Sequence, residues 1–350
     1  MELDILRKIL VIKLSAIGDV LVSSPIFGLL AVDNEVHHLV MEQCSSVTLN
    51  NPSITKHHII SLIPSGNRWL DLWQTFRLIL KLREEKYDVA FILHRNIVFQ
   101  IICRLAGVRK IYGFSSRLNP FFTNHMPYRF DVNRTLQECK LLRLGGFNVK
   151  DPECLEFYPQ IDVLPPRLLS ILPERFVACN PGGGNPHSPA DNRLWPIENY
   201  AELIRRSPLP FVILGYGQPD EQLVIRLCKL LEPKEIINLV GKTSFSETAL
   251  ILKLATLYVG NDSSLMFLGA AMQTKTIGLY GPTQVEAAKP IGKQQYAIRS
   301  DSSCSPCYDP YLGINGRMYT CNNNICMQEI EVEKVLGKMM KILELRASQV

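Results

Sequence analysis

Residues 258–272, YVGNDSSLMFLGAAM, combine the end of an apolar strand, a tight polar turn and a helix of small residues. Asp262 or Ser263 can cap this helix through a side-chain oxygen. The free N–H groups of the first helical turn then favour an anion. A second strand over 275–280 follows at once and ends in Gly-Pro-Thr at 281–283. Because α/β sheets build phosphate sites where two strands end near one helix N-terminus, these residues predict a pocket for the phosphates of a nucleotide-linked donor.

The composition is that of a globular protein with two domains. At 350 residues the chain exceeds a comfortable single core, and its apolar content of 47% and charged content of 20% are ordinary. The net charge of +5 is mild, so no nucleic-acid partner is expected. The charge is uneven, since residues 95–150 hold ten Lys or Arg against two acids. This basic region is either a solvated helix face or a surface that attracts an anionic substrate or anionic lipid head groups.

No targeting or membrane-spanning segment is expected. The sequence has no run of 18 apolar residues, and residues 1–8 carry acids and lead directly into a strand, unlike a signal peptide. Six cysteines lie among apolar neighbours and are expected to be core thiols: Cys44, Cys103, Cys139, Cys154, Cys179 and Cys228. We therefore expect a reducing, cytoplasmic setting.

A carboxylate follows the first strand of the chain. Residues 8–14, KILVIKL, are typical of a buried strand in a parallel sheet, and a helix is expected over 20–30. Gly18 permits a tight turn and places Asp19 at the carboxyl end of this strand, where open α/β sheets hold their ligands. Asp19 is therefore a candidate general base, and the plain alternative is that it only caps the helix.

Two further features of the first half concern an acceptor. The strand over 87–93 ends in His94, expected to form a structural hydrogen bond, and in Arg95, expected to contact a phosphorylated acceptor. The helix over 67–86 carries an apolar stripe at helical spacing, formed by Trp69, Trp73, Phe76 and Leu80. Such a stripe is usually core. A membrane-facing or acceptor-facing role is the alternative, because basic residues flank it at Arg68, Arg77, Lys81 and Arg83.

A second series of alternating strands and helices begins after a proline-rich crossing. We therefore divide the chain into domains over 1–165 and 166–327, each with an open parallel sheet. A final helical segment over 328–350 is a candidate to pack back on the first domain.

Small and charged residues follow the strands of the second domain. The strand over 175–180 runs into three glycines at 182–184, which permit close backbone approach to a ligand. Arg193 can reach a diphosphate, and Asp220 can accept hydrogen bonds from ribose hydroxyls. No G-x-G-x-x-G follows the first strand of the chain, which disfavours an NAD-dependent oxidoreductase.

The order of these motifs resembles glycosyltransferase family nine, the heptosyltransferases of lipopolysaccharide core assembly. The residues that carry the resemblance span the chain: 12–20 (IKLSAIGDV), 180–183 (NPGG), 193–196 (RLWP), 240–244 (VGKTS), 260–263 (GNDS), 281–283 (GPT) and the cysteine tail. The resemblance implies a GT-B fold, an α/β architecture of two Rossmann-like domains that face across a cleft. The donor is then bound mainly by the second domain and the acceptor by the first.

The same resemblance implies a reaction and its partners. It implies inverting, metal-independent transfer of heptose from ADP-heptose to the inner core on lipid A. The implied partners are a nucleotide sugar, a phosphorylated lipid-linked glycan and the anionic inner face of the cytoplasmic membrane, without a cofactor.

The resemblance also assigns roles to single residues. Asp19 becomes the base, and Gly18 and Arg95 belong to the acceptor site. Ser188 is expected to donate a hydroxyl to the donor, Arg193 to contact its phosphates and the backbone of Thr243 to read adenine. With Asp220, the expected donor-site residues are Ser188, Arg193, Thr243, Asp262, Ser263, Ser264 and Leu265.

The sequence departs from the family pattern in two places. Family members usually follow Asp-Ser with Gly-Pro and then Met-His, whereas Ser264, Leu265 and Phe267 stand here in place of Gly, Pro and His. Arg193 replaces the commoner Lys, which keeps the charge but changes the geometry. Two alternatives follow: a family member that uses another nucleotide sugar for a surface glycan, and a sugar-nucleotide-binding protein without catalysis.

Four cysteines near the end of the chain form a motif of their own. Cys304-x2-Cys307 and Cys321-x4-Cys326 have spacings that suit a four-thiolate zinc site, or they shape a loop without a metal. We expect the loop role and no metal. The sequence has no D-x-D pair, which fits transfer without a metal at the diphosphate.

Overall fold

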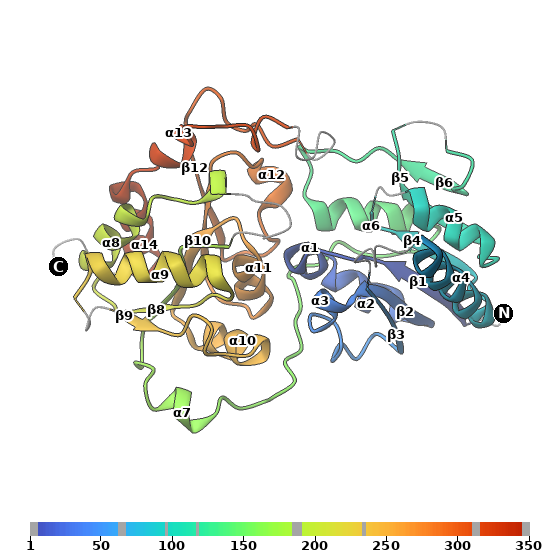
Figure 1. The fold of residues 1–350 in the computed structure, drawn as a ribbon, viewed down its shortest axis with the longest axis horizontal. Helices are drawn as coiled ribbons and strands as arrows, with labels where there is room; N and C mark the ends of the chain where they lie inside the picture. Colours follow the sequence, from blue (N-terminus) through green and yellow to red (C-terminus); the bar gives the residue numbers. More distant parts are fainter. Residues whose placement is uncertain are drawn as a thin grey trace. The chain divides into compact units, whose positions relative to one another are not determined.

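The computed structural model describes residues 6–61, 68–94, 97–116, 119–183, 191–232, 236–309 and 316–344. The chain forms two compact units, whose elements are labelled in Figure 1. The first unit comprises Met1–Pro152 and Glu156–Tyr158, and the second comprises Glu153–Leu155 and Pro159–Val350. The boundary placed after residue 165 from the sequence falls a few residues inside the second unit.

The first unit is built on six parallel strands. Its elements in chain order are β1 (Arg7–Ile12), α1 (Ile17–Val22), α2 (Ser24–Ala31), β2 (Asn34–Met41), α3 (Glu42–Ser45), β3 (Lys56–Ile60), α4 (Arg68–Glu85), β4 (Val89–Ile92), α5 (Ile97–Leu105), β5 (Lys110–Phe114), β6 (Asn124–Met126) and α6 (Arg134–Leu144). The strands lie in the order β3-β2-β1-β4-β5-β6, and all neighbouring pairs are parallel.

Helices cover both faces of this sheet because successive side chains of a strand point to opposite sides. Ile9 and Val11 of β1 enter one core together with side chains of α2 and α6. Leu10 and Ile12 enter a second core with side chains of α4 and α5. The continuous apolar run in β1 is therefore explained by burial on both faces, as predicted.

The single helix expected over 20–30 is wrong. The structure has two helices, because Pro25 lacks an N–H group and restricts the residue before it. The first helix also begins three residues earlier than expected, at Ile17.

The second unit repeats the architecture of the first. Its elements are α7 (Pro166–Leu169), β7 (Val177–Asn180), the 3-10 turn η1 (Asp191–Arg193), α8 (Ile197–Arg205), β8 (Phe211–Ile213), α9 (Gln218–Leu230), β9 (Ile236–Asn238), α10 (Phe245–Leu254), β10 (Leu257–Asn261), α11 (Ser264–Ala271), β11 (Thr276–Tyr280), α12 (Val285–Ala288), β12 (Gln295–Arg299), α13 (Ile325–Gln328) and α14 (Val332–Ile342). The strand order β12-β11-β10-β7-β8-β9 is again fully parallel.

The final helix packs within the second unit. Val335 and Met339 of α14 share a core with Trp195 and with Tyr200 of α8. Packing of the C-terminal helix on the first domain, considered from the sequence, stays a prediction. The apolar face of α14 is buried against α8 and its neighbours.

Both sheets place the first and fourth strands of their unit side by side. In an open parallel sheet, ligands bind outside the carboxyl ends of the strands at this point, where the strand order reverses. The relevant ends are those of β1 and β4 in the first unit and of β7 and β10 in the second. The predicted α/β class with two parallel-sheet domains is confirmed. In the described part of the chain, no helix combines the length and apolar character that crossing a bilayer requires.

Candidate active site

The glycine loop after β7 is held in place by a buried carboxylate. Asp220, in the first turn of α9, accepts hydrogen bonds from the backbone N–H groups of Gly183 (3.1 Å) and Tyr216 (3.0 Å) and from Asn180 Nδ2 (3.2 Å). A Cβ atom at Gly182 would lie 2.0 Å from Asp220 Oδ1, so the loop tolerates no side chain there. Asp220 was expected to accept from ribose hydroxyls; the contacts in the structure make it a positioning residue for this loop.

Asn261, at the end of β10, joins the glycine loop to the segment that carries Arg193. Its Nδ2 donates to the carbonyls of Pro181 (2.8 Å) and Gly182 (3.1 Å). Its Oδ1 accepts from the backbone N–H of Trp195 and from Tyr200 Oη, both at 3.0 Å. The sequence placed Asn261 in a motif without giving it a role, because its four partners are far away along the chain.

Arg193 and Asp262 lie together, as the shared phosphate role predicted. Arg193 Nη1 is 3.5 Å from Asp262 Oδ2 and 3.4 Å from the Asp262 carbonyl oxygen. The first distance suits an ion pair but not a strong hydrogen bond. Asp262 is buried, whereas the Arg193 side chain is a quarter exposed. The guanidinium therefore has donors left for a ligand.

The N-terminus of α11 faces the same place. Its N-cap is Ser263, which makes no side-chain capping hydrogen bond, so the expected side-chain cap is absent. Gly183 has φ +99°, and a Cβ atom there would lie 2.4 Å from Ser263 Cβ. The glycine loop thus lies directly against the start of α11.

Buried polar atoms without a partner gather at this point. Asn180 Oδ1, Asp262 Oδ2 and Ser263 Oγ are all buried and make no hydrogen bond to another described residue. Such atoms are uncommon in folded proteins and require an explanation. Of these atoms, only Ser263 Oγ can donate to a phosphate, because the Asn180 and Asp262 oxygens are acceptors. Ser263 Oγ, the free N–H groups of α11 and the Arg193 side chain therefore form the part of this site that suits the phosphates of a nucleotide.

The loops after β8 and β9 border the glycine loop. The backbone N–H of Gly241 donates to the carbonyl of Gly215 at 3.0 Å. Thr243 follows in the same loop, and its Oγ1 bonds Thr248 Oγ1 at 2.8 Å. The residue that caps α10 is Ser244, through a reciprocal capping box with Glu247. Thr243 therefore lies immediately before an ordered helix start, with its backbone adjacent to these loops.

The remaining expected donor residues lie on α11 or outside the described residues. Ser264 and Leu265 form the first turn of α11. Phe267, which stands where the resemblance leads us to expect His, is buried within the unit and presents no polar group. Ser188 and Arg95 lie outside the described residues.

In the first unit, Asp19 lies at the third position of α1. Arg134 Nη1, from the first residue of α6, donates to Asp19 Oδ1 at 2.8 Å, and the Ala16 N–H approaches Oδ2 at 3.4 Å. The carboxylate therefore caps α1 and also pairs with a cation, while 39% of its side chain stays exposed. Burial acts to raise the pKa of Asp19, but the charges of Arg134 and Lys13 outweigh it and the pKa is lowered. Asp19 is ionised at neutral pH.

A buried cluster of charged side chains lies near the carboxylate of Asp19. Lys13 Nζ and Ser23 Oγ both donate to Glu138 Oε1 at 2.9 Å. Burial acts to lower the pKa of Lys13, but Glu138 and Asp19 outweigh it and raise the pKa. Lys13 therefore stays charged beside Asp19. Neither Arg134 nor the Lys13–Glu138 pair was assigned from the sequence.

The other residues expected near Asp19 have structural positions. His94 accepts the Leu14 N–H at Nε2 (2.5 Å), which confirms the expected structural hydrogen bond. Gly18 lies within α1 and not in a turn before it, because the helix begins at Ile17. Its lack of a side chain leaves the backbone beside Asp19 open.

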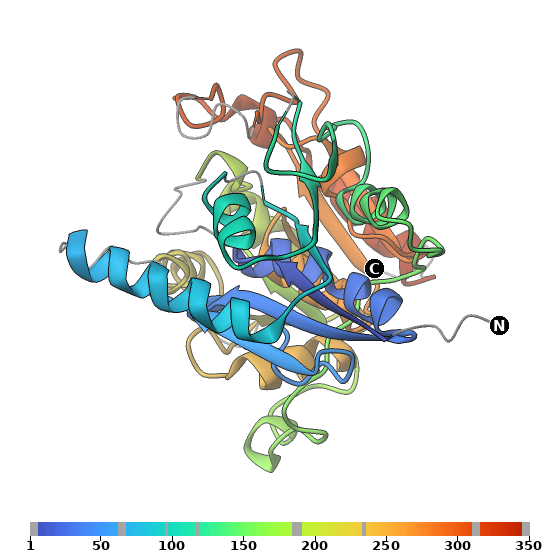
Figure 2. The ribbon, with the colours of Figure 1, turned by 90° about the vertical axis from the view of Figure 1, so that its right-hand side faces the viewer.

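The first unit also exposes an apolar surface on two neighbouring helices, which we call the α4–α5 face. Figure 2 shows α4 as a long helix whose first turns extend past the strands. The exposed side chains are Trp69, Leu72, Trp73, Phe76 and Leu80 of α4 and Ile97, Val98, Ile101 and Leu105 of α5. The stripe on α4 is therefore not core; the face of α4 that packs on the sheet carries Leu78, Ile79 and Leu82 instead.

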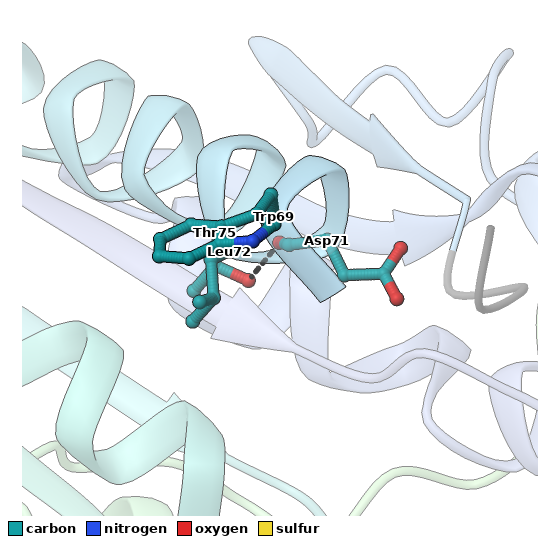
Figure 3. Close-up of a pocket in the computed structure, with 4 residues that line it drawn as sticks. All are labelled: Trp69, Asp71, Leu72 and Thr75. Atoms are coloured by element: carbon teal, nitrogen blue, oxygen red, sulfur yellow. Dashed lines mark hydrogen bonds between the residues drawn. The ribbon is translucent and has the colours of Figure 1, made fainter. Parts of the chain in front are cut away.

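Aromatic and basic side chains occur together on the α4–α5 face. Trp69 is 82% exposed and lines a pocket with Asp71, Leu72 and Thr75. In Figure 3 the rings of Trp69 and the side chain of Leu72 lie side by side, and the carboxylate of Asp71 points away from them. The Arg77 guanidinium lies 4.6 Å from the centre of the Trp73 ring. A patch with large exposed rings and adjacent cations is typical of a binding surface.

Comparisons with known proteins agree with this architecture. Residues 173–311 match the sequence model of glycosyltransferase family 9 (heptosyltransferase). Lipopolysaccharide heptosyltransferase 1 of Campylobacter coli is 24% identical over 356 residues, which cover 96% of this chain and 98% of that protein.

Two solved structures show the same fold over the whole chain. The glycosyltransferase family 9 protein of Veillonella parvula superposes with a TM-score of 0.78 at 20% identity and covers 98% of this chain and 99% of its own. The ADP-heptose lipopolysaccharide heptosyltransferase II of E. coli superposes with a TM-score of 0.72 at 20% identity and covers 96% of this chain and 98% of its own. The two parallel-sheet units therefore have the GT-B fold of these structures.

Proposed function

We propose that the chain is a member of glycosyltransferase family 9, the heptosyltransferases, and that it transfers heptose from ADP-heptose to a phosphorylated inner core on lipid A; the match of residues 173–311 and the similarity to a heptosyltransferase along nearly the whole chain support this. The E. coli relative of the same fold is described as acting with ADP-heptose, which supports this donor. The reaction inverts the anomeric carbon in a single displacement.

The observation that carries the proposal is the polar site at the carboxyl ends of β7 and β10. The buried Ser263 Oγ, which has no hydrogen-bond partner among the described residues, an α11 start without a side-chain cap and the Arg193 guanidinium meet there. These groups suit a diphosphate, because backbone N–H groups and a guanidinium both donate to phosphate oxygens. The glycine loop lets the backbone approach such a ligand closely.

The two units divide the chemistry. In the first unit, ionised Asp19 accepts the proton of an acceptor hydroxyl as that oxygen bonds to the anomeric carbon. The bond between this carbon and the β-phosphate oxygen breaks, and ADP leaves with the electron pair. In the second unit, Arg193 and the N–H groups of α11 stabilise the charge that gathers on the departing diphosphate. These groups make a divalent ion unnecessary at this step.

We infer further that the protein works at the inner face of the cytoplasmic membrane, where the acceptor lipid is anchored. The α4–α5 face supports this inference. Trp69, Trp73 and Phe76 expose large rings that suit the membrane interface, and Arg77 and Lys81 are exposed beside them on the same helix.

A transfer assay tests the proposal directly. Purified protein is mixed with ADP-heptose and a lipid A acceptor that bears a phosphorylated inner core, and the product is weighed by mass spectrometry. We expect a heptosylated lipid, one ADP per transfer and a rate that does not depend on added Mg²⁺ or Mn²⁺. Product from a different nucleotide sugar alone would favour the first alternative, and donor binding without turnover would favour a binding protein.

The donor site has its own test. Arg193→Gln should weaken ADP binding by about 10- to 100-fold, because a hydrogen bond to a charged group contributes roughly 1.5–3 kcal/mol. Arg226→Gln is the matched control, since Arg226 makes an exposed pair with Glu198 on the surface. Titration calorimetry with ADP measures both. Equal affinities in the two variants would remove Arg193 from the donor site.

A further inference from the structure

The four cysteines of the C-terminal motif come together in the second unit. Cys304, Cys307 and Cys321 lie on irregular segments that follow β12, over 301–309 and 316–324, and Cys326 lies on the short helix α13. Cys304, Cys307 and Cys321 line one pocket. Cys326 is buried.

Both cysteine pairs are anchored at the same point, the end of β11. The backbone N–H of Cys307 donates to the carbonyl of Pro282 at 2.9 Å, and Ser305 Oγ donates to the carbonyl of Gly281 at 2.5 Å. From the other segment, Cys326 Sγ lies where a Cβ atom on Gly281 would be only 2.8 Å away. Cys307 and Cys326 thus converge on two consecutive residues, although 19 positions separate them in the sequence.

We propose that Cys304, Cys307, Cys321 and Cys326 bind one zinc ion as four thiolates. Structural zinc sites use four ligands and place cysteines in pairs separated by two to four residues, which is the spacing of both pairs here. Each thiol loses its proton to solvent as its sulfur bonds to the ion, so binding releases protons and weakens as the pH falls. The ion is structural, because four protein ligands leave no open position for a substrate.

The ion would also draw the two segments together. No three of these sulfur atoms lie within 4.8 Å of one another in the described structure. Cys307 and Cys326 are the more buried member of each pair, whereas Cys304 is exposed. The thiols of the exposed Cys304 and the half-buried Cys321 therefore have to move toward the two anchored thiols. Binding that closes a loop in this way stabilises the folded state.

This site is connected to the proposed donor site. Asn192 Nδ2 donates to the carbonyls of Met318 (2.6 Å) and Cys321 (3.1 Å). Asn324 Nδ2 donates to the carbonyl of Leu194 at 3.0 Å. The cysteine segment therefore holds the residues on both sides of Arg193. Zinc acts here by positioning the Arg193 segment and not by contacting substrate.

A second group of possible ligands, on the first unit, is a closed hydrogen-bond network instead. His37, His58 and Glu85 place ligand atoms within 4.8 Å of one another. The Tyr87 hydroxyl bonds both imidazoles at 2.7 Å, and Lys8 and Lys56 pair with Glu85. These partners already occupy the groups that a metal would need.

Metal analysis of the full chain tests the proposal. The protein is purified without a histidine tag and without chelator, under reducing conditions, and its metals are measured by plasma mass spectrometry. We expect roughly one zinc ion per chain. The variants Cys304→Ser and Cys321→Ser remove the less buried ligands, and both should lose most of the zinc. Cys228→Ser is the control, because Cys228 is distant in sequence from the motif and is exposed on α9, so its expected position in the core is wrong.

Two further readouts separate this proposal from the proposed function. Removal of zinc should lower the melting temperature of the wild-type protein and the affinity for ADP, and added zinc should restore both. Replacement by Co²⁺ should give the absorption of a tetrahedral thiolate complex. A metal-free protein that takes up no zinc, zinc retained in both serine variants, or disulfides among these cysteines in the reduced protein would each overturn the site. None of these results depends on heptosyl transfer.

Discussion

At the scale of single residues, the environment of Asp19 decides what this carboxylate can do. Its pKa is lowered because Arg134 and Lys13 outweigh burial, so it is ready to accept a proton at neutral pH. Asp19→Asn keeps the shape of the side chain and removes the charge. We expect kcat/KM to fall by about 10²- to 10⁴-fold, the usual contribution of a general base. Asp33→Asn, an exposed carboxylate on the same unit, should leave kcat/KM unchanged. Both variants should keep the wild-type circular dichroism spectrum.

Arg134 gives a second prediction, about pH. Arg134 favours the ionised form of Asp19. In the wild type, the pH at which kcat/KM falls on the acidic side should therefore lie below the ordinary pKa range of a carboxyl group. In Arg134→Gln the pKa of Asp19 rises, so kcat/KM should fall at a higher pH than in the wild type. The measurement is kcat/KM from acidic to neutral pH. A loss of rate without a shift in this pH would mean that Arg134 only shapes the site. Arg129→Gln breaks an exposed pair with Asp131 and serves as control.

The sequence could not predict contacts between residues that lie far apart along the chain. Asp19 and Asp262 were predicted because each follows a strand within a recognisable motif, and Arg193 was predicted from the motif that it begins, Arg-Leu-Trp-Pro. Their environment was not found, since Arg134 lies 115 positions from Asp19 and Glu138 lies 125 positions from Lys13. Asn261 was missed for the same reason, because its partners lie 61 to 80 positions away. Contacts over such distances are set by the folded sheet and leave no local pattern.

At the scale of elements, the contact between the glycine loop and α11 is the feature to test. Gly183 has φ +99°, and an added Cβ would lie 2.4 Å from Ser263 Cβ. Gly183→Ala therefore combines a left-handed backbone cost of about 1–2 kcal/mol with an overlap at the start of α11. We expect a lower melting temperature and weaker ADP binding, measured by differential scanning fluorimetry and calorimetry.

The variant Gly146→Ala separates the cost of the left-handed backbone from the cost of the overlap. Gly146 has φ +85° and no atom within 4 Å of an added Cβ, so it carries the backbone cost without an overlap. It should lower the melting temperature but leave ADP affinity unchanged. If both alanine variants bind ADP like the wild type, the loop contact plays no part in the donor site.

The types of the elements were predictable, and several of their ends were not. Apolar runs such as residues 8–14 identify buried strands because both faces of each sheet are covered. The start of α10 was available in the sequence, since Ser244 and Glu247 have the spacing of a capping box. The start of α11 without a side-chain cap could not be predicted, because a serine in the N-cap position ordinarily accepts a hydrogen bond from a backbone N–H of the helix. That departure falls where the ligand is proposed to bind.

At the scale of the whole molecule, two sheets share one strand order. The alternation of strands and helices predicted two parallel sheets, but it could not give the order of the strands, because pairing joins distant segments. It also could not decide between core and surface for the stripe on α4. The spacing of Trp69, Trp73, Phe76 and Leu80 fits either role, and only the position of the sheet shows that another face of α4 is buried.

The exposed stripe leads to a prediction about membranes. We expect the protein to bind vesicles that contain anionic lipid more tightly than neutral vesicles, because Arg77 and Lys81 lie beside the aromatic side chains. Raising the salt concentration should weaken the anionic preference by screening. The double variant Trp69→Ser with Leu72→Ser should lower the partition coefficient at least tenfold, since a fully buried apolar side chain contributes roughly 1.5–3 kcal/mol. Vesicle sedimentation measures all three.

The control for this experiment lies on the second unit. Ile225 of α9 is 56% exposed, close to the 61% of Leu72, and Leu254 of α10 is also exposed. Ile225→Ser with Leu254→Ser therefore removes two exposed apolar side chains from helices outside the α4–α5 face. We expect this variant to bind vesicles like the wild type. If both double variants lose binding equally, the attraction is a general property of the surface. If neither loses it, the α4–α5 face is not the membrane contact, and its exposed rings must bind something other than lipid.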